Sequence, residues 1–98
     1  MATNFKVFVH RNSENVHLLL TGDFDGTSAY ELLEVMRRNS FRASRVFIHT
    51  ASLRHIEPFG RAVFCNNLNA FKARSLRLFF TGNKASQLAS EEAQISLG

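Results

Sequence analysis

The acidic residues Asp23 and Asp25, in the segment TGDFDG, are of a type that can bind metal ions or transfer protons. They follow the alternating apolar residues 16–21, and open α/β sheets bind ligands beyond the carboxyl ends of such strands. We therefore expect both carboxylates to face one crevice, where they could hold a divalent cation or a small ligand. Helix capping and a place on the rim of the fold are the alternative. The sequence favours this alternative, because only Glu57 could supply a third acid.

The segment Glu57-Pro58-Phe59-Gly60 is the second candidate, because it should begin a helix directly after a connection. Pro58 suits the first helical position, the charge of Glu57 suits the positive end of a helix dipole, and Gly60 allows close backbone approach. Phe59 is either an exposed anchor for a partner or a ring that folds back onto the connection or the first helix. Both interpretations remain open from the sequence.

Two hydroxyl groups lie in the connection before that helix, on Thr50 and Ser52. Either could accept a phosphate group. Hydroxyls in such connections more often bond to the local backbone, which is the competing interpretation.

The composition is that of one folded domain, with 98 residues, 45% of them hydrophobic and 20% charged. The core should span residues 5–90, and residues 91–98 read as a weakly patterned tail that could fray. Cys65 is the single cysteine, so no internal disulfide can form. No apolar run approaches the roughly 20 residues that span a bilayer, and no secretory signal is visible. These features predict a cytoplasmic protein that needs no cofactor.

The net charge of +4 is modest, but it allows an alternative function in nucleic-acid binding. No motif that interleaves aromatic and basic residues as RNA-recognition domains do is present, which lowers the odds of this alternative. The arginines that would serve it are Arg37, Arg38, Arg42, Arg45, Arg74 and Arg77.

The periodicity predicts four strands and three helices in the order β-β-α-β-α-β-α. Period-two alternation indicates strands at residues 5–10, 16–21, 45–50 and 76–81. Apolar stripes at helical spacing indicate helices at residues 27–39, 58–72 and 84–90. Ser28 and Glu31 fit a capping box for the first helix, with Asp25 as the alternative cap. The expected fold is an α/β domain whose mostly parallel four-stranded sheet has an antiparallel edge strand.

This order and two motifs resemble the STAS domain, the fold of anti-sigma factor antagonists and of sulfate-transporter tails. The segment LLLTGDFDGTSAYELLEVM is similar to the family pattern L-x-G-x-L-D-x-x-T-A-x-x-L, and RVFIHTASLRHIEPFGRAVF resembles V-x-L-D-L-S-x-L-x-x-I-D-S-S-G. The matching residues are Gly22, Asp25, Ala29, Leu32, Val46, Ile48, Leu53, Ile56, Glu57 and Gly60.

The chain departs from the family pattern at the residue that matters most for regulation. In the family, a kinase phosphorylates the serine just before the glycine of D-S-S-G. Phe59 stands at that position here, after Pro58, and a phenyl ring cannot accept phosphate. His49 stands where the family has an acidic residue.

The resemblance implies a non-enzymatic protein-binding module of bacterial signalling and transcription regulation that lacks the usual switch. Its partner would be an anti-sigma factor, a kinase-like protein or a sensory complex. The residues expected to form the partner-binding site are Asp23, Asp25, Glu57, Pro58, Phe59 and Gly60.

Overall fold

The computed structural model describes residues 4–41, 43–68, 71, 76–89 and 94–96. Within these residues one sheet has the strand order β1-β2-β3-β4-β5. β1 and β2 are antiparallel, and every later pair is parallel. The strands are β1 (Lys6–Asn12), β2 (Asn15–Phe24), β3 (Arg45–Ile56), β4 (Arg77–Thr81) and β5 (Gln94–Ser96).

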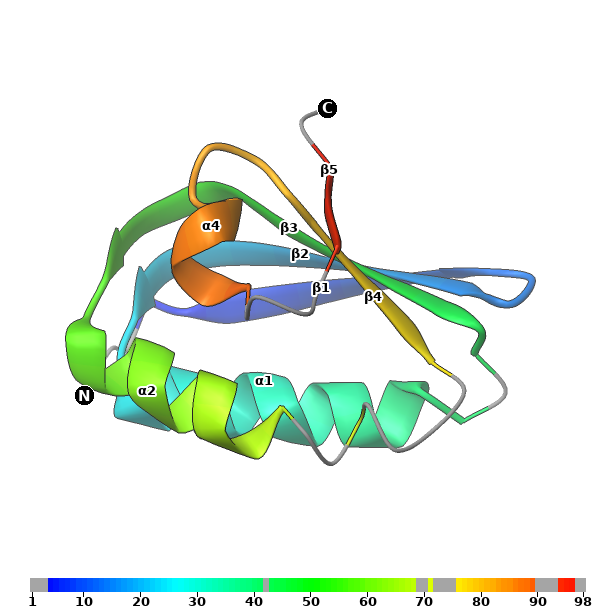
Figure 1. Cartoon of the computed structure of the whole chain (residues 1–98), viewed down its shortest axis with the longest axis horizontal. Helices are drawn as coiled ribbons and strands as arrows, with labels where there is room; N and C mark the ends of the chain where they lie inside the picture. Colours follow the sequence, from blue (N-terminus) through cyan, green and yellow to red (C-terminus); the bar gives the residue numbers. More distant parts are fainter. Residues whose placement is uncertain (1–3, 42, 69–70, 72–75, 90–93, 97–98) are drawn as a thin grey trace.

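In the described part of the chain, the helices lie on one face of this sheet and none covers its other face (Figure 1). α1 (Gly26–Asn39) and α2 (Pro58–Asn67) pack side by side, and the single turn α4 (Ala85–Leu88) packs between α2 and the sheet. No helix in the described part of the chain is long and apolar enough to cross a membrane.

The core fills the space between the sheet and the helices. Alternate residues of each central strand point into it, as the period-two pattern requires. Four phenylalanine rings run through it in edge-to-face contact, with centroids 5.6, 6.1 and 6.2 Å apart in turn. These rings belong to Phe5, Phe24, Phe64 and Phe80.

The predicted α/β class, the strand and helix order and the antiparallel edge strand are confirmed. The connection expected between the strand at residues 45–50 and the helix at Pro58 was predicted to be a loop. This prediction is wrong, because β3 continues to Ile56. Two irregularities in the pairing with β2, between Leu19 and Thr21 and between Gly22 and Asp23, keep the longer strand in register. Leu53 and Ile56 are thereby buried, which explains why an apparently loop-like segment stays in the sheet.

Two further boundaries differ from the sequence-based expectation. α2 ends at Asn67, and most of its expected extension to residue 72 lies outside the described residues. Gln94–Ser96, in the segment expected to be a frayed tail, pairs with β4 as a fifth strand.

Candidate functional site

The N-termini of α1 and α2 touch at the end of the sheet where β2 and β3 finish. The backbone N–H of Glu57 donates to the carbonyl oxygen of Phe24 at 2.8 Å. A Cβ atom added to Gly60 would lie only 2.6 Å from the carbonyl carbon of Asp25. Only glycine permits this approach, so Gly60 fixes how the two helix starts fit together.

Asp25 is the N-cap of α1 and is nearly buried. Its Oδ1 accepts a hydrogen bond from the backbone N–H of Ser28 at 2.9 Å, and the Ser28 hydroxyl donates to the same oxygen at 2.9 Å. Asp25, the alternative cap, is therefore the one formed, and the capping box expected from Ser28 and Glu31 is wrong. This carboxylate stabilises the exposed N–H groups of the first turn.

Asp23 has different partners from Asp25. One of its oxygens accepts from Asn4 Nδ2 at 3.2 Å and lies 3.4 Å from Arg54 Nη2. Of these two carboxylates, only that of Asp25 lines the depression described below. Among the described residues, no group of three or more His, Cys, Asp or Glu side chains could hold a metal ion.

Phe59 lies at the first turn of α2 and is 69% exposed. Its ring lies against the first residue of α1, since a Cβ atom added to Gly26 would lie 2.7 Å from Phe59 Cε2. The ring folds over the first helix and still presents most of its surface to solvent, and its role as a partner anchor stays a prediction. The ring is thus in contact on one side and exposed on the other.

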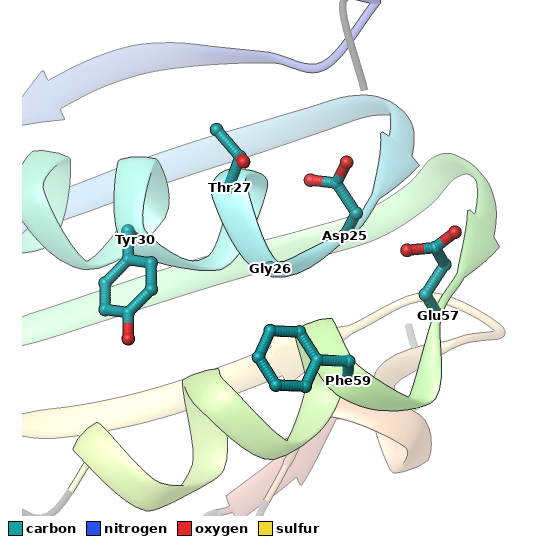
Figure 2. A pocket seen from close by; sticks show the side chains of 6 residues that line it. All are labelled: Asp25, Gly26, Thr27, Tyr30, Glu57 and Phe59. Carbon is teal, nitrogen blue, oxygen red and sulfur yellow. The ribbon is translucent and has the colours of Figure 1, made fainter. Parts of the chain in front are cut away.

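An open depression of about 320 Å³ lies beside this ring (Figure 2). Its lining comes from the starts of both helices. Tyr30, one turn into α1, is 61% exposed and forms the far side. Glu57 is also exposed, and its side chain makes no capping hydrogen bond. The lining residues are Asp25, Gly26, Thr27, Tyr30, Glu57 and Phe59.

Of the residues predicted to bind a partner, Asp25, Glu57 and Phe59 line this depression, and Asp25 and Gly60 are buried. Gly26, Thr27 and Tyr30 were not predicted to contribute. Tyr30 could have been found, because an aromatic residue off the apolar stripe of an amphipathic helix must face solvent. Gly26 carried no such signal, since its role depends on a ring from a different helix.

The two candidate phosphoacceptors differ in accessibility. Thr50 is fully buried and its hydroxyl donates to the carbonyl oxygen of Thr81 at 2.7 Å. Ser52 is exposed on β3. In the folded chain, therefore, only the Ser52 hydroxyl of this pair is open to an enzyme.

The four described arginines of the nucleic-acid alternative lie in two separate pairs. Arg37 and Arg38 extend from the last turn of α1, where both pair with Glu34. Arg45 and Arg77 are neighbours in the sheet, where β3 and β4 begin. Arg42 and Arg74 lie outside the described residues.

No protein-family model matches the sequence, and no curated protein matches it. Solved structures match its fold. The anti-sigma factor antagonist SpoIIAA, in its unphosphorylated form, matches with a TM-score of 0.70 at 11% identity, over 96% of this chain and 88% of that one. This chain has a STAS-like fold.

Two further structures extend the STAS-like comparison. An uncharacterized DUF3478-family protein with a SpoIIAA-like fold, from Shewanella loihica, matches with a TM-score of 0.60 at 9% identity, over 100% of this chain and 88% of that one. The structure of Mglu matches with a TM-score of 0.68 at 20% identity, over 88% of this chain. The match covers 20% of Mglu, so this chain corresponds to about one fifth of that protein. At these identities the likeness establishes the fold.

Proposed function

We propose that this STAS-like chain is a non-enzymatic protein-binding module of bacterial signalling, similar to an anti-sigma factor antagonist. The observation that carries the proposal is the Phe59 ring, which is 69% exposed yet held against Gly26. Aromatic residues dominate the energetics of protein interfaces, and a ring that is already positioned loses little freedom on binding.

The proposed partner-binding site is the surface around the two helix starts. Phe59 is its centre, and Tyr30 widens it across the depression. Glu57 and Pro58 are exposed beside the ring, and Asp23 adds a partly exposed carboxylate nearby. Buried Gly60 serves it by letting α2 approach the backbone of Asp25, and the Asp25 side chain caps α1.

This docking surface differs from the family pattern in how it would be regulated. A phosphoserine would add nearly two negative charges at the start of α2, and Phe59 has no hydroxyl to accept them. Binding would instead follow the amounts of chain and partner. Of the two candidate phosphoacceptors, Thr50 and Ser52, only Ser52 is exposed to an enzyme.

The partner class that fits this proposal is an anti-sigma factor or a related kinase-like protein, alone or within a sensory complex. Such a partner would present an apolar pocket for the ring of Phe59. The proposal places both proteins in the cytoplasm and requires no cofactor.

The test is titration calorimetry with a purified kinase-like anti-sigma factor of the source organism. Phe59→Ala should weaken binding by about 2 kcal/mol or more, roughly thirtyfold, because a central aromatic anchor is lost. Its stability should change by less than about 1 kcal/mol, since the ring is mostly exposed.

The matched control is Phe41→Ala, which removes another exposed phenyl ring, 72% accessible, beyond the end of α1. It should bind like the wild type. Equal affinities for the wild type and Phe59→Ala would refute the docking role of the ring.

A further inference from the structure

The open face of the sheet has an ordered set of side chains that the docking proposal does not use. Residues that alternate with the buried ones point away from the helices, and strand pairing aligns them in rows across the sheet. The first row is Asn12, Asn15, Arg45 and Arg77; the second is His10, His17, Phe47 and Phe79; the third is Phe8, Leu19, His49 and Thr81.

The second row is a continuous line of aromatic rings. His17 stacks on Phe47 with centroids 4.6 Å apart, and Phe47 stacks on Phe79 at 4.9 Å. His10 continues the line at 6.2 Å from His17. Because His17, Phe47 and Phe79 turn their faces toward one another, their ring edges point away from the sheet, and Nδ1 of His17 lies 3.0 Å from Nε2 of His49. The edge of an aromatic ring is its electropositive part.

The charged side chains in and next to these described rows are positive. Arg45 and Arg77 stand side by side in the first row, and Lys6 lies beyond the third row opposite Thr21. None of the residues in these rows is acidic. The nearest acids on β2 and its turn are at the ends, where Glu14 accepts from Ser44 and Asp23 pairs with Arg54.

We propose that this open sheet face binds single-stranded nucleic acid. Phosphate groups would pair with Arg45 and Arg77, and exposed bases would pack against the aromatic row and against Phe8, which is 53% exposed. Each nucleotide supplies both an anion and an aromatic surface, which is the combination that these adjacent rows accept. A second copy of the chain would instead bring like charges together.

A single strand suits this face better than a duplex. The bases of a duplex are stacked on one another, so their faces cannot reach a shallow sheet surface. The face also lies on the opposite side of the sheet from α1 and α2 (Figure 1), so it is separate from the depression beside Phe59.

The test is fluorescence anisotropy of the full chain with a labelled oligothymidylate of about 15 nucleotides, at about 50 and 200 mM salt. The wild type should bind at the lower salt. Arg45→Gln/Arg77→Gln should weaken binding by about tenfold and reduce the salt slope by about one to two. Phe8→Leu should weaken it by about fivefold, because an exposed aromatic surface is lost.

Matched variants on the helix side control for charge and for ring loss. Arg37→Gln/Arg38→Gln removes the same charge from α1, and Phe41→Leu removes an exposed ring. Both should retain wild-type affinity. Equal weakening by the two arginine pairs would overturn the proposal, as would no binding at the lower salt.

Three competitor probes address other anionic partners. The chain should prefer the oligothymidylate over a duplex of the same length, over polyglutamate and over vesicles containing anionic phospholipid, compared at equal charge. Equal or tighter binding to any of the three would overturn the assignment to single-stranded nucleic acid.

Discussion

At the residue scale, two glycines determine where the Phe59 ring lies. Gly60 lets α2 approach the backbone of Asp25, and Gly26 leaves room for the ring itself. The same substitution at the two positions should therefore have opposite consequences, because one meets rigid backbone and the other meets an exposed side chain.

Gly26→Ala should leave stability unchanged or slightly higher, since alanine is favoured over glycine in a helix by about 0.5–1 kcal/mol. The added Cβ would displace the Phe59 ring, so partner binding should weaken by about tenfold. Thermal unfolding and calorimetry with the partner measure the two effects separately.

Gly60→Ala is the contrasting variant. Its Cβ would meet the Asp25 backbone at 2.6 Å, so the loss should be in stability, by about 1–3 kcal/mol. If Gly26→Ala kept full affinity for the partner, the fixed position of the ring would have no functional importance.

A serine at position 59 should restore what the family pattern has and this chain lacks. Phe59→Ser puts a hydroxyl at the first turn of α2, near the positive end of the helix dipole. We expect a kinase-like anti-sigma factor to phosphorylate this variant and to leave position 59 of the wild type unmodified. Mass spectrometry after incubation with ATP measures this.

The informative negative result concerns the variant. Suppose that the Phe59→Ser variant binds the partner but carries no phosphate at position 59 after incubation. The start of α2 would then resemble the family's phosphorylation site in sequence only. A phosphate on Ser52 of the wild type would instead identify another regulated hydroxyl.

At the element scale, the sequence predicted the strands and helices better than their lengths. Alternation in residues 16–21 and 45–50 was sufficient to find β2 and the first half of β3. The second half of β3 lacks strict alternation because the pairing irregularities shift which residues face the core. A local pattern cannot show such a shift, since it depends on the neighbouring strand.

The same limit applied to the candidate site. Glu57, Pro58 and Gly60 predicted the start of α2 from their own preferences, and that start is where expected. The contact of Phe59 with Gly26 joins residues far apart in the chain, so no local rule could find it. The pair of Asp23 and Asp25 looked like one site, but strand and cap geometry give the two carboxylates separate roles.

The histidine pair across β2 and β3 should make stability depend on pH. His17 Nδ1 lies 3.0 Å from His49 Nε2, and His49 Nδ1 lies 2.6 Å from Thr81 Oγ1. Burial, with a smaller effect of the nearby His17, lowers the pKa of His49 below its ordinary value of about 6.5. The folded chain therefore resists a proton that the unfolded chain accepts.

The sign of the effect follows from this lowered pKa. The contribution of His49 is fully present above about pH 6.5, and the free energy of unfolding should fall as the pH drops below that value. Urea unfolding between about pH 8 and 5 measures it. His49→Gln should flatten the dependence, while His55→Gln, an exposed histidine on the same strand, serves as the control. An unchanged slope in His49→Gln would contradict the assignment.

At the scale of the whole molecule, the fold separates two surfaces. The core of edge-packed phenylalanine rings joins the sheet to α1 and α2, and the helix starts present Phe59 at one end of that layer. The aromatic row and its arginines occupy the opposite face of the sheet. The two proposals together predict that a protein partner and a nucleic-acid strand can bind at the same time.

The overall α/β order was predictable because each element has its own periodicity. The fifth strand was not, since three residues at Gln94–Ser96 are too few for a periodic signal and pair only because β4 offers an edge. The sequence could not predict the two separate binding surfaces either, because the rows of side chains form only when the strands pair in register.

The most direct measurement of the central claim is the map of amide chemical-shift changes when the labelled chain is titrated with the proposed anti-sigma factor partner. The largest shift changes should fall on residues that line the depression, with Gly26, Tyr30 and Phe59 foremost. The amide shifts of His17 and Phe47 should not change. Largest changes on the open sheet face, with none at the helix starts, would contradict it.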